Sequence, residues 1–169
     1  MKFQKLTIKN IASIEEAEID FDAEPLSNSG IFLITGKTGS GKSTILDCIC
    51  LALYGTTPRL ENTNIQGATT DLETEVKVND SRLLMRRNTS ECSVCLTFVG
   101  NDKKCYQAEW SCKRARGKVE GALQSKTRQL TNLTDNFVYS KDKDIVPEIK
   151  RIIGLDFEQF LRTVMLSQG

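Results

Sequence analysis

Residues 31–44 read IFLITGKTGSGKST, and this stretch decides the fold of the chain. Its glycine-rich part, Gly36 to Ser43, matches the pattern GxxxxGK[ST] at every fixed position. The apolar run Ile31 to Thr35 before it is typical of a buried central strand. From Ser43 onward, apolar residues fall at helical spacing until Gly55 stops the pattern. A strand, a glycine-rich loop and a helix in this order predict a phosphate-binding loop, or P-loop.

The residue types of the loop explain how it would hold phosphate. Glycines let backbone N–H groups turn inward around phosphate oxygens, and the following helix directs the positive end of its dipole at the same charge. Lys42 adds a cation for the β and γ phosphates, and the Ser43 hydroxyl is a hard oxygen ligand for Mg²⁺. The motif does not choose between ATP and GTP, and we expect Mg-ATP. The expected phosphate contacts are Gly36, Lys37, Thr38, Gly39, Ser40, Gly41, Lys42, Ser43 and Thr44.

Length and charge narrow the class of protein. The 169 residues suit one domain, and the formal net charge of +1 means that any nucleic-acid surface would have to be a local patch. The apolar run Ile45 to Tyr54 is interrupted by Asp47 and is too short to span a membrane. The first residues lack the apolar core of a signal peptide, so we expect a cytoplasmic protein with no membrane partner.

Histidine and cysteine usage excludes several kinds of site. The chain has no histidine, which removes His-based triads and HExxH zinc sites. Six cysteines in a cytoplasmic chain are expected to be reduced thiols, and Cys48 and Cys50 suit the core face of the helix after the loop. Cys92 and Cys95 have metal-ligand spacing, but on a strand they would point to opposite faces, so we do not expect zinc.

The rest of the chain predicts an α/β fold, with a mixed β-sheet that has an N-terminal antiparallel part, one P-loop unit and flanking helices. Residues 56–80 are rich in Thr and Asn and weakly patterned, and we expect mostly loop there. The other expected elements are an antiparallel pair over 4–9 and 17–21, a hairpin over 91–99 and 104–111, a helix with its apolar face at Ile145, Ile149, Ile152 and Ile153 that ends at Gly154, and a short helix from Phe157 to about Val164.

Several blocks resemble the N-terminal lobe of SMC-like ABC ATPases. The opening residues 6–13, the loop with the residues up to Asp47, and the final residues 160–169, which look like a Q-loop, carry this resemblance. Within that group the chain resembles the SbcC family, ATPase subunits of bacterial DNA double-strand-break nucleases. That finer resemblance rests on residues 53–60, 89–92 and 110–116, with Gly121, Leu123 and Gln124 after them. Residues 67–77 and 125–139 do not take part in it.

The resemblance implies roles for residues outside the loop. It implies that Gln168 senses Mg²⁺ and the attacking water, and that Lys42 serves hydrolysis. It also suggests that Met85, Arg86 and Arg87 lie near the nucleotide. Some relatives have an arginine where this chain has Ala12, so that phosphate contact is not carried over.

The resemblance also implies an assembly. Residues 1–169 would form the N-terminal lobe of an ATPase head, from P-loop to Q-loop, with a coiled coil and a C-terminal lobe of the same chain elsewhere. Two heads would form a homodimer around ATP and Mg²⁺, and their engagement would regulate an SbcD-type nuclease subunit on double-stranded DNA in double-strand-break repair and recombination. The isolated chain is expected to hydrolyse almost no ATP, because the carboxylate base belongs to the other lobe.

The sequence leaves open the role of the basic cluster, the class of P-loop protein and the role of Asp47. Lys113, Arg114, Arg116 and Lys118 next to Trp110 form either a DNA-backbone contact or a solvated loop. A P-loop nucleotide or small-molecule kinase would share the motif and could use Arg114 and Arg116 as lid residues. A noncatalytic, nucleotide-gated DNA clamp would share it too. Asp47 is either a surface residue of the helix or a support for the loop.

Overall fold

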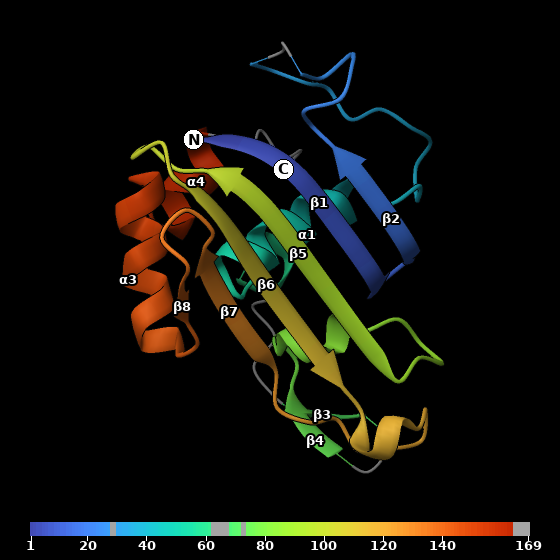
Figure 1. The fold of residues 1–169 in the computed structure, drawn as a ribbon. Helices are drawn as coiled ribbons and strands as arrows, with labels where there is room; N and C mark the ends of the chain where they lie inside the picture. The colour runs from blue at the N-terminus through green and yellow to red at the C-terminus, as the bar shows by residue number, and fades with distance from the viewer. Residues whose placement is uncertain (28–29, 62–67, 72–73, 164–169) are drawn as a thin grey trace.

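Figure 1 shows the computed structural model, which describes residues 1–27, 30–61, 68–71 and 74–163. A six-stranded sheet has the order β2-β1-β5-β6-β7-β8, and a separate hairpin pairs β3 with β4. The strands are β1 Lys2–Ile11, β2 Ile14–Asp20, β3 Ala68–Asp71, β4 Thr74–Lys77, β5 Glu91–Val99, β6 Cys105–Lys113, β7 Thr127–Asn132 and β8 Phe137–Tyr139. The α-helices are α1 Lys42–Tyr54, α2 Pro58–Glu61, α3 Asp142–Ile153 and α4 Phe157–Thr163, with single 3₁₀ turns at Ser81–Leu84 and Ala115–Gly117.

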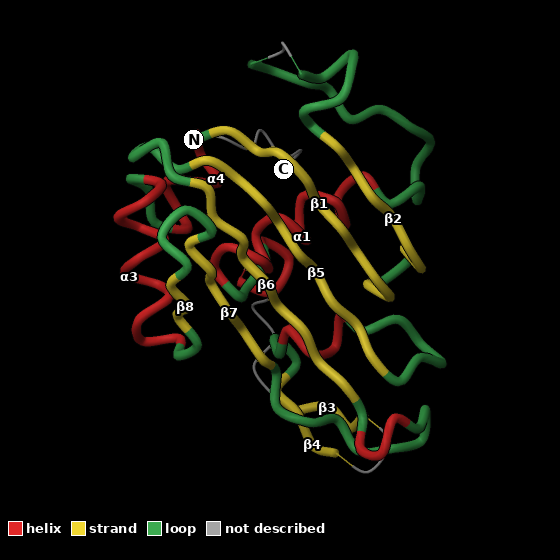
Figure 2. Tube along the Cα trace, viewed as in Figure 1, coloured by secondary structure: helices red, strands yellow, loops and turns green. Residues whose placement is uncertain are grey.

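The sheet has one covered face and one outer face, and α1 packs against β1, β5 and β6 on the covered side (Figure 2). Because side chains alternate along a strand, every second residue of β5 and β6 points into this core. Leu96 and Phe98 of β5 and Trp110 of β6 are fully buried there. The predicted antiparallel pair and the predicted hairpin are both confirmed as β1–β2 and β5–β6.

Helix α1 is confirmed with the predicted end. Gly55 follows it with φ 73°, and its N–H donates to the Leu51 carbonyl over 3.0 Å, which is a left-handed helix cap. Cys48 and Cys50 are buried on its core side, as predicted. Gly55 is also in close contact with another element, because the buried Arg128 side chain from β7 lies directly on it.

The two C-terminal helices complete the covered layer. The face of α3 with Ile145, Ile149, Ile152 and Ile153 is buried, and Gly154 ends the helix with φ 81°, so this prediction is confirmed. Helix α4 begins at Phe157 as predicted and buries Phe160 against Tyr54 of α1, with ring centroids 5.4 Å apart. Its predicted last residue, Val164, lies outside the described residues.

The α/β class with an antiparallel part and flanking helices is confirmed, but the strand predicted at Ile31 to Thr35 is wrong. The side chains of Ile31 and Leu33 are 89% and 84% exposed, and residues 31–36 belong to no strand. Phe32 points the other way, onto Phe21, with ring centroids 5.0 Å apart. An apolar run indicates only that both faces of a segment can be buried. A β-strand also needs a neighbouring strand with which its backbone can form hydrogen bonds. Residues 31–36 take no part in either described sheet, and every described strand pairing is antiparallel.

Two other regions differ from expectation. The loop predicted over residues 56–80 contains the helix α2 and the hairpin β3–β4, and the sheet continues through β7 and β8, which the sequence did not indicate. The inward positions of β7 are Arg128, Leu130 and Asn132. Two of these three are polar residues with hydrogen-bond partners inside the fold, so the strand lacks the apolar alternation that reveals β5.

Candidate nucleotide-binding site

The glycine-rich loop has the backbone shape that a phosphate cradle needs. Gly39 and Gly41 have φ values of 82° and 91°, in the left-handed region that favours glycine. Gly41 is the N-terminal cap of α1, and as a glycine it has no side chain that could hydrogen-bond to the first turn of the helix. The first N–H groups of α1 therefore remain available to an anion, and the helix dipole favours negative charge at this position.

Lys42 is aimed back across the loop. Its Nζ donates to the carbonyl oxygens of Gly36 and Lys37 over 2.7 and 2.8 Å. The ammonium therefore stands over the glycine-rich loop, and Ser43 follows it directly in the first turn of α1. A cation, uncapped helix N–H groups and a hydroxyl at one end of a helix fit a phosphate group, and the hydroxyl suits a hard cation such as Mg²⁺.

The turn between β1 and β2 lies against the loop. A Cβ placed on Gly41 would be 3.4 to 3.6 Å from Ser13 and Ile14 atoms. The turn is also held by the last residue of the first 3₁₀ turn, because the Ala12 N–H donates to Leu84 O over 2.7 Å. A depression of about 490 Å³ opens here, lined by Ala12, Leu83, Met85, Arg86, Arg87 and Asn88.

The three residues suggested by the resemblance therefore lie on one segment beside this turn, in different environments. Met85 is buried and forms a bridge with Ile11. The Arg86 guanidinium donates from Nη1 to Ser13 O over 2.8 Å and is 3.9 Å from Glu15. Arg87 is exposed, and the described residues offer its guanidinium no hydrogen bond or ion pair. Gln168 lies outside the described residues.

Asp47 acts as a structural support within the loop's helix. Its carboxylate is buried on α1 and accepts the Arg59 Nη2 of α2 over 2.7 Å, while the Arg59 side chain is half exposed. Burial raises the pKa of Asp47, and the Arg59 charge opposes that rise. The ion pair ties α1 to α2, so Asp47 is not a surface residue of the helix, and this bond leads to α2 and not to the loop.

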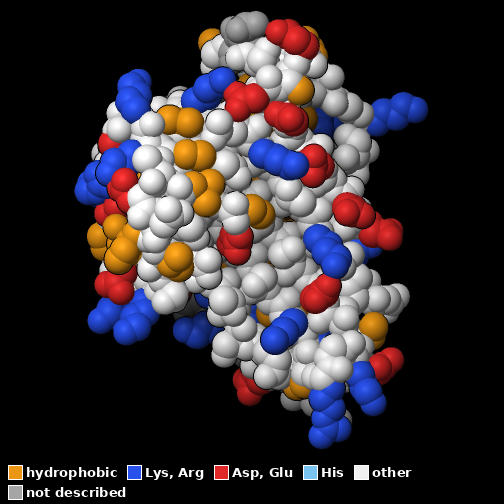
Figure 3. All heavy atoms as spheres, viewed as in Figure 1, with side chains coloured by type: hydrophobic (Ala, Val, Ile, Leu, Met, Phe, Trp, Pro, Cys, Tyr) orange, Lys and Arg blue, Asp and Glu red, His pale blue; other side chains and the backbone are white. Residues whose placement is uncertain are grey.

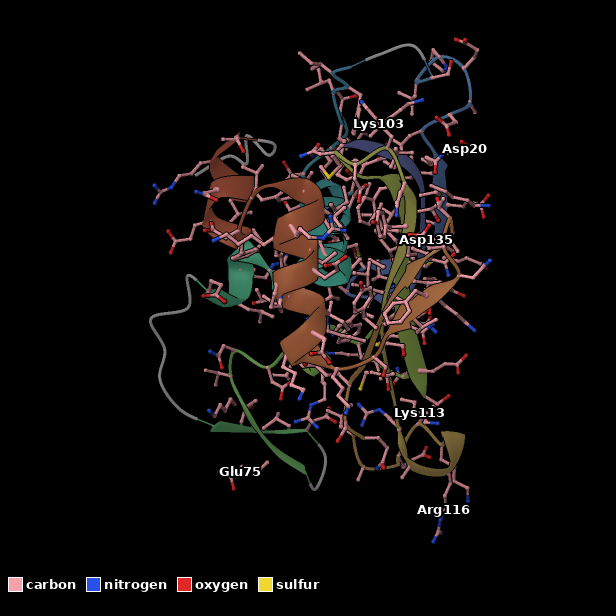
Figure 4. All side chains as sticks on the ribbon, turned by 60° about the vertical axis from the view of Figure 1, so that its left-hand side comes forward. Asp20, Glu75, Lys103, Lys113, Arg116 and Asp135 are labelled. Atoms are coloured by element: carbon pink, nitrogen blue, oxygen red, sulfur yellow. The ribbon has the colours of Figure 1, made fainter. Side chains whose placement is uncertain are left out.

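The basic cluster of residues 113–118 is smaller than the sequence suggested. Trp110 is fully buried in the core, so it offers no aromatic surface beside the cations. Arg114 is also buried, with its guanidinium bonded to Asp71 over 2.7 and 3.1 Å and to Gly121 O over 3.1 Å. Lys113 and Arg116 do project outward, at the end of the sheet that carries the β3–β4 hairpin (Figure 4). Neither a DNA contact nor a lid role fits Arg114.

The outer face of the sheet carries charges of both signs. Figure 3 shows Lys and Arg interspersed with Asp and Glu there, so this face has no electrostatic field of a single sign.

Cys92 and Cys95 point to opposite faces of β5, as predicted for a strand: Cys92 is buried in the core, and Cys95 lies on the outer face. Within the described residues, no group of three or more potential ligands could hold a metal ion, and no helix is long and apolar enough to cross a membrane.

The loop, the capless helix start and the adjoining antiparallel sheet together define a P-loop nucleotide-binding domain. The chain belongs to the AAA domain family, whose model matches residues 5–169. It is similar to the SbcC subunits of the nuclease SbcCD from Pseudomonas aeruginosa, with 43% identity over 172 residues, and from Rhodobacter capsulatus, with 41% identity over 176 residues. In both comparisons the whole of this chain is covered, but only 14% of the relative.

Two more distant comparisons agree on the fold. The "DNA double-strand break repair Rad50 ATPase" of Saccharolobus solfataricus is 27% identical over 170 residues, covering 100% of this chain and 15% of that protein. Among solved structures, the recombination mediator RecF with ATP matches with a TM-score of 0.55 and 16% identity. That match covers 86% of this chain and 29% of RecF, and it supports the arrangement of elements alone.

Proposed function

We propose that this chain is the N-terminal, nucleotide-binding lobe of an SMC-like ATPase head of the SbcC type, which acts in DNA double-strand-break repair. The observation that carries the proposal is the P-loop at the start of α1, in a chain that is 43% and 41% identical to two SbcC proteins. The lobe would extend over residues 1–169, from the P-loop to a Q-loop that contains Gln168.

Mg-ATP is the proposed ligand. The backbone of Gly36 to Gly41 would surround the terminal phosphates, together with Lys42 and the first N–H groups of α1. Lys42 would exchange its two loop carbonyls for phosphate oxygens, which are stronger partners because they are charged. The Ser43 hydroxyl and Gln168 would hold Mg²⁺, which neutralises charge on the phosphates when bound.

A second lobe of the same protein is the proposed neighbour of residues 31–35. This segment leads directly into the P-loop, and it presents the exposed side chains of Ile31 and Leu33 away from Phe32. A strand of a C-terminal lobe beside it would bury these side chains and complete a mixed sheet. Two completed heads would then form a homodimer around ATP and control an SbcD-type nuclease subunit on double-stranded DNA.

Substitution of the P-loop lysine tests the proposal. In the whole protein, Lys42→Ala should weaken binding of a fluorescent ATP analogue at least tenfold and abolish ATP hydrolysis, because the phosphates lose a direct cation. The control is Lys118→Ala, which removes an exposed lysine that follows the second 3₁₀ turn and should leave both measurements unchanged. Equal binding by Lys42→Ala and wild type would contradict nucleotide binding at this loop.

Two further measurements on the whole protein, head closure and phosphate transfer, separate the alternatives. Nucleotide-gated head closure without any hydrolysis by the whole protein would support a noncatalytic clamp instead. The kinase interpretation is weakened by the structure, because Arg114, one of its two lid candidates, is committed to Asp71. Phosphate transfer from ATP to small-molecule acceptors would support the kinase interpretation.

A further inference from the structure

The turn between β1 and β2 is held in a conformation that its own residues do not favour. Asn10 near the end of β1 and Ala12 just after it have φ values of 54° and 48°, a left-handed conformation that asparagine tolerates and that is unusual for alanine. Such conformations persist only where surrounding contacts impose them. Here Asn10 donates from Nδ2 to Glu91 O over 3.0 Å and accepts at its own carbonyl from the Arg86 N–H over 2.9 Å.

The segment 84–86 supplies most of this restraint. In addition to the Arg86 N–H, it provides Leu84 O as acceptor for Ala12 and a bridge between Met85 and Ile11. The Arg86 guanidinium then reaches past these backbone contacts to Ser13 O, 2.8 Å away. Because Ser13 and Ile14 are the residues that face Gly41, this bond acts on the part of the turn that touches the P-loop.

Arg86 and Arg87 are adjacent in the sequence, but their side chains differ in their hydrogen-bond partners. The side chain of Arg86 is 35% exposed and already bonded to the turn, whereas Arg87 is exposed and has no partner among the described residues. Both line the depression beside Ala12, whose methyl side chain leaves that space open. A guanidinium that binds a phosphate must be able to offer its donors, and only Arg87 does so without breaking an existing bond.

We propose that Arg86 is a positioning residue, which fixes the 10–14 turn against Gly41 and so sets the shape of the P-loop. The inference deepens the proposed function and rests on it for the expected effect on nucleotide affinity. The role of Arg86 is a property of the protein without nucleotide. It predicts that the loop changes when the Arg86–Ser13 bond is lost.

The test compares Arg86→Gln, Arg86→Lys, Arg87→Gln and Arg82→Gln in the whole protein. Arg82 is the matched control, because it is an arginine of the same segment that bonds to Asp80 and not to the turn. Two properties are measured: affinity for a fluorescent ATP analogue with Mg²⁺, and hydrogen exchange of the Ser40 and Ile45 amides without nucleotide. These two amides bond to the loop carbonyls of Lys37 and Gly41.

Arg86→Gln should weaken the affinity about tenfold and accelerate exchange of the two amides, and Arg86→Lys should restore most of both, because lysine keeps a donor for Ser13 O. Arg87→Gln should weaken affinity and leave exchange unchanged, and Arg82→Gln should change neither. Weaker affinity of Arg86→Gln with wild-type exchange would overturn the positioning role, as would wild-type values of both. If wild type binds no nucleotide, the proposed function fails, whereas the exchange measurement still decides the role of Arg86.

Discussion

At the scale of single residues, the sequence shows which backbone conformation a position needs more readily than it shows which distant side chain packs against that position. Gly55 was predicted as the end of α1 because a left-handed cap favours glycine. The structure adds a second reason, since a Cβ at this position would lie 2.9 Å from Nε and 3.0 Å from Cζ of Arg128. That contact depends on β7, a strand distant in the chain that the sequence did not indicate.

The two reasons can be separated by substitution. Gly55→Ala should lower the free energy of unfolding by about 2 to 3 kcal/mol, of which about 1 kcal/mol is the backbone cost and the rest is displacement of Arg128. Arg128 cannot move freely, because it is buried and bonded to Leu53 O and Asp142 over 2.8 and 2.7 Å. Gly117→Ala is the control, with φ 63° and no atom within 4 Å of its Cβ, and should cost only about 1 kcal/mol in urea denaturation. Equal losses in both variants would show that the Arg128 contact adds nothing.

At the scale of elements, strands and helices with a clear apolar period were predictable, and those held by polar contacts were not. The strand β5 and the helix α3 follow their alternation and helical spacing closely. The hairpin β3–β4 has no such alternation. It is attached by an ion pair between Asp71 of β3 and Arg114 after β6, together with Val76 of β4, which is buried in the core. A segment with polar residues and no clear apolar period is predicted as a loop, because the sequence does not show which distant residue its charged side chains bind.

The Arg114–Asp71 ion pair should therefore contribute more to the free energy of unfolding than the exposed charged residues near it. Arg114→Ala should lower the free energy of unfolding by about 2 kcal/mol, because it leaves the Asp71 carboxylate and the Gly121 carbonyl without their donor in a largely buried setting. Lys113→Ala, at an exposed neighbouring position, should change it by less than about 0.5 kcal/mol. Limited proteolysis should cut the hairpin faster in Arg114→Ala alone. Matching stabilities of the two variants would remove the anchor role.

At the scale of the whole molecule, the P-loop was predicted correctly and the strand before it was not. The loop and α1 depend on local residue types such as Gly41 and Lys42, which the sequence contains in full. The burial of residues 31–35 depends on neighbouring elements: Phe32 packs on Phe21, whereas the side chains of Ile31 and Leu33 are largely exposed. The apolar character of Ile31 and Leu33 indicates a segment suited to burial, but their cover is not among the described elements.

The exposure of Ile31 and Leu33 predicts that their substitution affects stability differently in the 169-residue chain and in the whole protein. The double substitution Ile31→Ser with Leu33→Ser should change the free energy of unfolding of the 169-residue chain by less than about 0.5 kcal/mol, because both side chains are exposed there. In the whole protein it should destabilise the completed head by about 3 to 5 kcal/mol, the burial energy of two large aliphatic side chains, and ATP hydrolysis should fall with it. Val146→Ser, an exposed apolar position on α3, should be neutral in both contexts.

The measurement is calorimetric unfolding together with steady-state ATP hydrolysis, on the chain and on the whole protein. The 169-residue chain should hydrolyse almost no ATP with or without the substitutions, since the proposed base belongs to the other lobe. A small effect of the double substitution in the whole protein would mean that these side chains stay in water there, and the proposed lobe contact would then have to lie elsewhere. Substantial hydrolysis by the chain that Lys42→Ala abolishes would show instead that one lobe carries the complete site.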